Sequence, residues 1–200
     1  MKKLAVVFIV FTFMGISQAQ AQSVQLGLGG GLTLVQSPDS WDKLDMSTGY
    51  HFGAKMKIGL PMSPVKITGQ LYYNTFSGEP TIEYEGYGSY DAEISTSLLI
   101  IGAGVEFELI PGPVSPYFGM DLFVAAPGDM EVKVAGYSET FDGGDSRFGL
   151  GLGGGVDFKL APGFDLDFAA KYNLYNLMGQ DDGEEDMNAI ALTASIMFGF

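Results

Sequence analysis

The stretch that decides the fold is ALTASIMFGF, at residues 191–200. Its apolar residues recur at every second position, with Leu192, Ile196, Phe198 and Phe200 on one side of the alternation and mostly small or weakly polar residues on the other. A period of two is that of a β-strand, whose side chains alternate between two faces, and not that of a helix. The stretch therefore predicts an amphipathic strand. The rest of the chain decides whether its apolar face meets a protein core or lipid.

The first residues have the layout of a secretory signal peptide. A positively charged start precedes an apolar run over residues 4–14, and Ala19 and Ala21 stand in A-x-A relation. The run is too short to span a bilayer comfortably. We therefore expect residues 1–21 to be cleaved after secretion and residues 22–200 to form one exported domain. The chain has no cysteine, which excludes both disulfides and lipid attachment through cysteine.

Beyond the expected signal, apolar and polar residues alternate in eight segments. These segments cover residues 24–35, 48–60, 65–76, 94–109, 114–126, 147–160, 164–177 and 188–200. Tight connections rich in Pro and Gly alternate with long, polar, acidic ones. The long connections cover residues 36–47, 77–93, 127–146 and 178–187. An even number of strands, with short turns at one end and long loops at the other, is typical of a bacterial outer-membrane barrel rather than a soluble one.

The two faces of these segments differ in chemistry. One face carries large apolar side chains, such as Phe148, Leu150 and Leu152, and the other carries charged residues and glycines. Eight inward sets of large apolar side chains would overfill an eight-stranded interior. Glycines, in contrast, make room for charged side chains inside a narrow barrel. We therefore predict that the apolar face meets lipid and that the charged face points inward.

The predicted interior charges balance. They are Lys55, Lys57, Lys66, Arg147, Lys159 and Lys171 against Glu106, Glu108, Asp121, Asp157, Asp165 and Asp167. Such a balance is expected because an unpaired buried charge is costly. The net charge of −14 becomes −16 without Lys2 and Lys3, and this excess lies in the long loops and their margins, where 18 acidic residues stand against Lys43 and Lys133. This excess of acid excludes nucleic acid as a partner.

With these features together, the chain resembles the small eight-stranded bacterial outer-membrane barrels, the OmpA transmembrane domain and OmpX-like proteins. The stretch 191–200 is similar to their C-terminal assembly signal, whose places are filled by Phe200, Phe198, Ile196 and Leu192. The resemblance implies an all-β, antiparallel up-and-down transmembrane β-barrel with short periplasmic turns and long extracellular loops. It further implies recognition by the barrel-assembly machinery and a monomer surrounded by the lipid of a Gram-negative-type outer membrane.

Three features of the sequence could form a binding or catalytic site, but each lacks part of the pattern that such a site requires. The glycine-rich stretch at 149–157 resembles a phosphate-binding loop, but a strand continues where such a loop needs a helix. The acidic run at 180–188 is suited to calcium or magnesium, but it lacks the EF-hand pattern. His51, the only histidine, has no assignable nucleophile and orienting partner. We therefore expect no catalytic residues, no bound metal and no cofactor.

The long loops remain as the place for function. Residues 81–91 and 130–142 alternate and carry central Gly-Tyr pairs, which predicts strands that run on beyond the membrane as protruding hairpins. The candidate contact residues are Tyr84, Tyr87, Tyr90 and Tyr137. Either a partner-binding edge or a rigid protective loop fits this pattern. We expect a structural or surface-interaction role toward a cationic or other surface partner. The alternatives are a small porin-like channel or transporter and a lipid-modifying enzyme that uses His51.

Overall fold

The computed structural model describes residues 23–38, 41, 44–84, 88–134, 137–178 and 185–200, with the backbone alone for residues 82–84 and 88–90. The expected signal peptide at 1–21 lies outside this part of the chain. The described elements form one antiparallel sheet of eleven strands. Within the same residues, no helix is long and apolar enough to cross a membrane.

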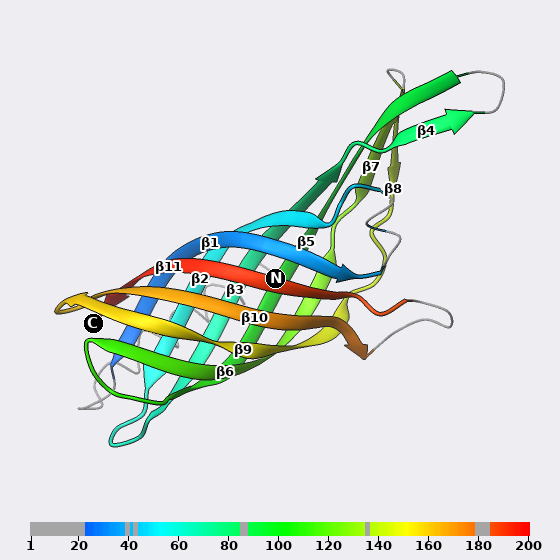
Figure 1. Ribbon diagram of the computed structural model, residues 1–200. Coiled ribbons are helices and arrows are strands. Elements are labelled where there is room, and N and C mark those ends of the chain that lie inside the picture. Colours follow the sequence, from blue (N-terminus) through cyan, green and yellow to red (C-terminus); the bar gives the residue numbers. More distant parts are fainter. Residues whose placement is uncertain (1–22, 39–40, 42–43, 85–87, 135–136, 179–184) are drawn as a thin grey trace, which may run out of the picture.

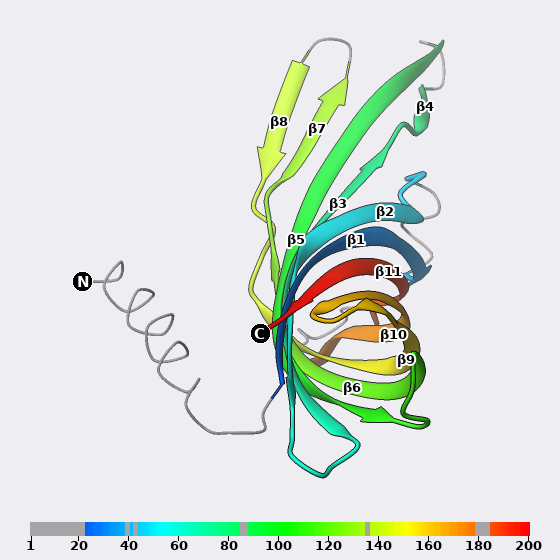
Figure 2. The same ribbon diagram turned by 90° about the vertical axis from the view of Figure 1, so that its left-hand side faces the viewer.

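Eight of the strands close into a barrel (Figures 1 and 2). They are β1 (Val24–Ser37), β2 (Thr48–Gly59), β3 (Val65–Gly78), β5 (Gly88–Glu108), β6 (Val114–Pro127), β9 (Arg147–Ala161), β10 (Phe164–Met178) and β11 (Asn188–Gly199). Each barrel strand pairs antiparallel with its neighbours along the chain, and the barrel closes where β1 pairs with β11. The eight strands confirm the segments that the alternation predicted. We call the end that carries Leu60, Pro111 and Gly163 the short-turn end and the opposite end the long-loop end.

Three further strands project from the long-loop end. They are β4 (Thr81–Tyr84), β7 (Met130–Val134) and β8 (Tyr137–Phe141). β5 runs on beyond the barrel and joins them, because β4 pairs with residues 88–91 and β7 with residues 92–95, while β8 pairs with β7. We call this four-stranded part the extension; Figures 1 and 2 show it standing well clear of the barrel. The two protruding hairpins were thus predicted correctly, but their union into one sheet through β5 was not.

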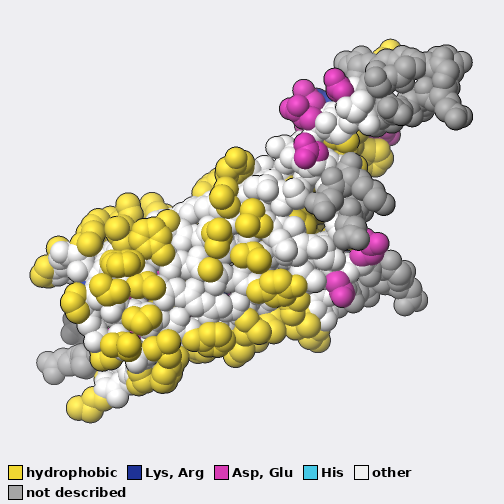
Figure 3. Space-filling view, in the orientation of Figure 1, with side chains coloured by type: hydrophobic (Ala, Val, Ile, Leu, Met, Phe, Trp, Pro, Cys, Tyr) yellow, Lys and Arg dark blue, Asp and Glu magenta, His cyan; other side chains and the backbone are white. Residues whose placement is uncertain are grey.

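The two faces of the barrel wall have the predicted orientation. Outward positions such as Phe52, Leu122 and Phe148 are exposed, whereas Lys57 and Asp157 on the alternate positions are buried. Figure 3 shows patches of apolar side chains along the visible barrel wall, while the visible Asp and Glu side chains lie toward the long-loop end and the extension. An apolar band around a closed barrel is the surface that a lipid bilayer requires.

Glycines make room for the interior side chains, as the sequence predicted. A Cβ atom added at Gly104 would lie 2.3 Å from a carboxylate oxygen of Asp121, and one added at Gly155 would lie 2.4 Å from the hydroxyl of Tyr117. Within the glycine-rich stretch 149–157 of β9, the alternate residues Gly149, Gly151, Gly153 and Gly155 face this narrow interior. A side chain at Gly104 or Gly155 would displace part of the charged network described below.

Candidate functional site

The half of the barrel interior nearest the short turns holds a network of buried charges. The Nζ atom of Lys55 lies 2.7 Å from Glu106 and 2.5 Å from Asp167. The Nζ atom of Lys57 lies 3.0 Å from Glu106 and 2.7 Å from Asp157. These five side chains are almost fully buried, so each charge depends on its partners for the stabilisation that water would otherwise give.

Lys57 also resolves a repulsion that the strand register creates. Asp157 on β9 stands directly opposite Asp167 on β10, and like charges in such a pair are destabilising. The Lys57 ammonium lies between them, 2.7 Å from Asp157 and 3.2 Å from Asp167. The hydroxyl of Tyr117 donates a hydrogen bond to Asp167 at 2.6 Å, and its aromatic ring lies beneath the Lys57 ammonium at 4.5 Å. Tyr117 is thus a member of the network that charge counting alone missed.

Two further lysines, Lys66 and Lys171, also form ion pairs inside the barrel. Lys66 lies 2.8 Å from Asp157 and 3.3 Å from Glu108, nearer the short-turn end. Lys171 pairs with Asp121 near the middle of the barrel. The hydroxyl of Thr68 donates to the same Asp121 carboxylate at 3.3 Å.

Three of the twelve predicted interior charges lie apart from these ion pairs. Asp165 accepts a hydrogen bond from the amide of Gln25 at 2.5 Å. Lys159 is exposed at the short-turn end, where it lines two hollows of about 590 Å³ each. Arg147 is half-buried at the opposite, long-loop end of β9. Lys159 was predicted to lie in the interior, whereas the structure exposes it. Alternation shows which face a charge is on but not how far along the barrel it lies.

The long-loop half of the interior is filled by apolar side chains, which the sequence analysis did not predict. Trp41 packs edge-on against Phe76 at 5.0 Å between ring centroids, and Phe123 packs against Tyr175 at 5.6 Å. Met46, from the loop between β1 and β2, is almost fully buried in the same cluster. The sequence does contain a pattern that predicts this cluster, because the inward positions toward the long loops carry aromatic and aliphatic residues instead of charges. This cluster fills the barrel lumen toward the long-loop end.

His51 lies between the two layers in a polar, hydrogen-bonded setting. Its Nδ1 atom lies 2.9 Å from the hydroxyl of Thr33, and its Nε2 atom lies 2.9 Å from the hydroxyl of Thr193. The Thr33 hydroxyl also donates to Asn74 at 2.9 Å. The adjoining cavity measures about 30 Å³, which suits about one water molecule and no substrate. This arrangement anchors four strands to each other.

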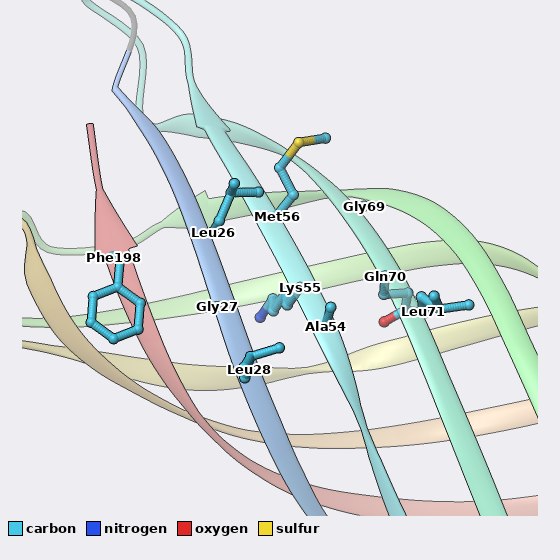
Figure 4. A pocket seen from close by; sticks show the side chains of 10 residues that line it. All are labelled: Leu26, Gly27, Leu28, Ala54, Lys55, Met56, Gly69, Gln70, Leu71 and Phe198. Carbon is cyan, nitrogen blue, oxygen red and sulfur yellow. The ribbon is translucent and has the colours of Figure 1, made fainter. Parts of the chain in front are cut away.

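The outer wall has a shallow apolar groove of about 500 Å³ over β1, β2, β3 and β11 (Figure 4). Ala54 and Gly69 form its low floor, and Leu26, Leu71 and Phe198 stand around it. Lys55 borders the groove only with its backbone, because its side chain points into the barrel and its ammonium pairs with Asp167. The groove belongs to the apolar band of the wall, where small and large outward residues alternate.

The extension has one apolar and one polar face. Cross-strand pairs share a face, and the pairs Ala92 with Val134 and Ile94 with Val132 continue the apolar lining of the barrel outward. Tyr137 and Phe141 of β8 carry this apolar face to the edge of the sheet, with 83% and 48% of their surfaces exposed. The polar face carries Thr81, Asp91, Glu93, Glu131, Lys133, Ser138 and Thr140.

Acidic groups dominate the electrostatics of the extension. Lys133 is the only Lys or Arg between residues 67 and 146, and its ammonium lies 3.3 Å from Glu131. The hydroxyl of Ser138 donates to Glu131 at 2.9 Å. This hydrogen bond and the nearby Lys133 ammonium hold the pKa of the Glu131 carboxyl below its ordinary value, so it stays charged. The remaining acids keep the extension strongly anionic.

The structure gives different amounts of detail for the four tyrosines that are the candidate loop contacts. Tyr137 is highly exposed at the start of β8. Tyr84 pairs with Gly88, and Tyr90 pairs with Ile82, through backbone contacts of β4 and β5. Tyr87 lies outside the described residues. Most of the acidic run at 180–188 also lies outside them, and among the described residues no group of three or more His, Asp or Glu is placed to hold a metal ion.

The residues that resemble the assembly signal lie on the outward face of β11. Leu192, Ile196 and Phe198 are exposed on the apolar band, and the amide of Phe200 donates to the carbonyl of Val24 at 2.9 Å. Phe200 itself is exposed at the short-turn end. A factor that recognises unpaired strands would therefore meet these four side chains before β11 closes the barrel against β1.

We expect deletion of Phe200 to reduce insertion into the outer membrane in cells while leaving refolding in detergent largely intact. The predicted assembly signal requires the aromatic ring for recognition, whereas the exposed ring contacts little of the folded interior. The measurement compares the barrel recovered in the outer-membrane fraction with the yield of the heat-sensitive folded band after refolding. Equal insertion with and without Phe200 would contradict the role of this residue in assembly.

These features define a class: an eight-stranded transmembrane β-barrel with a filled interior, an apolar belt and a projecting sheet. The model of the outer membrane protein beta-barrel domain matches residues 6–200. The chain belongs to this family. Its short turns are therefore periplasmic and its long loops and extension extracellular. The comparison with curated proteins found no match.

The comparison with solved structures found similar chains. The chain is similar to Neisserial surface protein A (NspA), with 18% identity, a TM-score of 0.51, and 90% of this chain and 97% of that chain covered. Ail, the attachment invasion locus protein of Yersinia pestis, has 17% identity and a TM-score of 0.47 over 88% and 97% of the two chains. The N-terminal β-barrel domain of Pseudomonas aeruginosa OprF has 12% identity and a TM-score of 0.44 over 89% and 97%.

Proposed function

We propose that the protein is a surface-interaction protein of a Gram-negative outer membrane whose extension binds an extracellular partner. The observation that carries this proposal is the continuation of β5 out of the barrel, joined by β4, β7 and β8. A sheet that leaves the membrane on a rigid barrel holds its side chains away from the cell surface. Binding residues concentrate on such projecting segments because the scaffold fixes their position.

Charge gives the chemistry of the proposed partner. Nearly all of the net negative charge of the chain lies in the extracellular loops and the extension. An anionic, projecting sheet repels the anionic bacterial surface and attracts a cationic one, with an effect that weakens as salt rises. We therefore infer a partner with a basic surface and binding that falls with ionic strength.

The filled interior favours a scaffold over a channel or an enzyme. The charged layer and the apolar cluster leave a cavity of about 30 Å³ between them, too small for a solute path through the described residues. His51 has threonines and an asparagine as neighbours, which do not form a nucleophile with its base and orienting acid. In the same proposal the chain acts as a monomer after cleavage of residues 1–21, without a metal or cofactor.

The test replaces residues 81–91 and 130–142 by short Gly-Asn turns. These cuts remove β4, β7, β8 and the outer part of β5, but they leave the barrel pairing of β3 with residues 94–107 of β5. A non-adhesive Gram-negative host that displays the wild type should gain attachment to cell-coated surfaces. The host that displays the trimmed barrel should not, although the trimmed protein keeps its heat-dependent gel shift.

Salt provides a second arm of this test. Attachment by the wild type should decline as ionic strength rises, because exposed charges are screened within about 8 Å at physiological salt. Full attachment by the trimmed barrel would contradict the proposal. Attachment that is indifferent to salt would contradict the basic partner while leaving the extension as the binding part.

A further inference from the structure

The outer edge of β8 has no neighbouring strand in the part of the chain that the structure describes. Among the described residues β8 pairs with β7 alone and ends the strand order of the sheet. All five of its residues are exposed. Edge strands are usually protected by charged side chains, proline, a bulge or very short length. β8 has no proline and no bulge, and Glu139 is its single charged residue. The other free edge belongs to β4, a strand of four residues that begins directly after Pro80.

We propose that β8 binds an extended segment of a partner protein as an added strand, and that this segment carries Lys or Arg between two apolar residues at alternate positions. The inference rests on the proposed function and names the partner chemistry for the same extension. Backbone hydrogen bonds to the free edge provide affinity, and the alternating side chains provide selectivity.

The side-chain pattern of β8 specifies this segment. Tyr137, Glu139 and Phe141 share one face, with the carboxylate of Glu139 between the two aromatic side chains. In an added strand, the side chains that stand opposite these residues lie on the same face. Apolar side chains therefore cover Tyr137 and Phe141, and a cation meets Glu139. Because this pattern is symmetric about Glu139, it suits either direction of the added strand.

The same residue opposes pairing with a second copy of the chain. Two β8 strands in full antiparallel register would place Glu139 opposite Glu139, since this residue is the central one of Tyr137–Phe141. Like charges that stand directly opposite each other destabilise a strand pair. The edge thus disfavours self-association and favours a cationic segment.

The probe is a synthetic peptide with valine, lysine and valine at alternate positions and threonine between them, titrated onto the full-length protein in nanodiscs. Only alternate amides of an added strand face its neighbour. Two N-methylated forms, methylated on one or the other set of alternate amides, should therefore differ. One form should lose at least about tenfold in affinity, and the other should bind within about twofold of the parent peptide.

A charge reversal tests the selectivity. The Glu139→Lys variant should bind the lysine peptide about tenfold more weakly and prefer a peptide with glutamate at the central position. The Asp91→Asn variant, which removes an acid from the polar face of the same extension, should keep the wild-type preference. An unchanged preference in Glu139→Lys would overturn the assignment of Glu139.

The outcomes separate this inference from the proposed function. Equal binding of both N-methylated peptides, or no binding of the parent peptide, would overturn strand addition even where attachment still requires the extension. Concentration-dependent dimers of the wild type in sedimentation, lost when residues 130–142 are replaced, would assign the edge to a second copy instead. Attachment that does not require the extension would overturn the proposed function itself.

Discussion

The Leu152→Arg variant is expected to lose about 2–4 kcal/mol of its free energy of unfolding in lipid vesicles. Leu152 lies near the middle of β9 and points outward, beside Tyr172 on β10 and Met120 on β6. A guanidinium at this depth must leave water or distort the bilayer around it. The measurement is a urea titration of the vesicle-inserted protein, followed by the fluorescence of its single tryptophan, Trp41.

Leu160→Arg is the matched control for this prediction. Leu160 faces outward on the same strand but lies at its periplasmic end, next to the last residue of β9. An arginine near the membrane interface costs about 0–1 kcal/mol. Equal stability of Leu152→Arg and the wild type would show that the apolar face does not meet lipid.

The Asp121→Asn variant is expected to lose about 3–5 kcal/mol of its free energy of unfolding, because it leaves the ammonium of Lys171 buried without its anionic partner. Both side chains are buried near the middle of the barrel. Asparagine keeps the size of the side chain, but it removes the negative charge and replaces one acceptor oxygen with a donor NH2 group. The same urea titration in vesicles gives the loss.

A double variant separates the charge from the packing. Asp121→Asn combined with Lys171→Met removes both charges, so it should recover most of the stability that the single variant loses. Lys159→Met, at the exposed short-turn end, should change the free energy of unfolding by less than about 0.5 kcal/mol. If Asp121→Asn is as stable as the wild type, water inside the barrel already satisfies Lys171 and the interior is not sealed.

The alternation of side chains was enough to predict most of the barrel. It gave eight strands and the correct face for residues such as Leu152 and Asp157, because a strand has only two faces and a closed barrel has only two environments. The inward glycines and the balance of interior charges followed from the same constraint. These features depend on residues that are close in sequence, so they can be predicted from a single amino-acid sequence.

The depth of each interior residue was harder to predict. Lys159 and Arg147 lie at opposite ends of β9, and neither joins the network around Lys57. Their depth depends on the stagger between strands that lie far apart in the sequence, which alternation does not give. The apolar cluster around Phe76 was missed for a related reason, since the inward face was described along its whole length as charged residues and glycines.

The extension shows the same limit. The alternation in 81–91 and 130–142 predicted two hairpins, but only the long run of β5 joins them into one sheet with a free edge at β8. This pairing links residues about 40 positions apart, such as Ala92 and Val134. The site that we propose is thus a product of long-range pairing, although each of its side chains was visible in the sequence.

The account requires that the extension stands outside the cell and the short turns lie in the periplasm. Labelling with a membrane-impermeant maleimide tests this directly, because the chain has no native cysteine. In intact cells Tyr137→Cys on the extension should react fully, whereas Met62→Cys in an exposed short turn should react only after the outer membrane is opened. Labelling of Met62→Cys but not of Tyr137→Cys in intact cells would contradict the account.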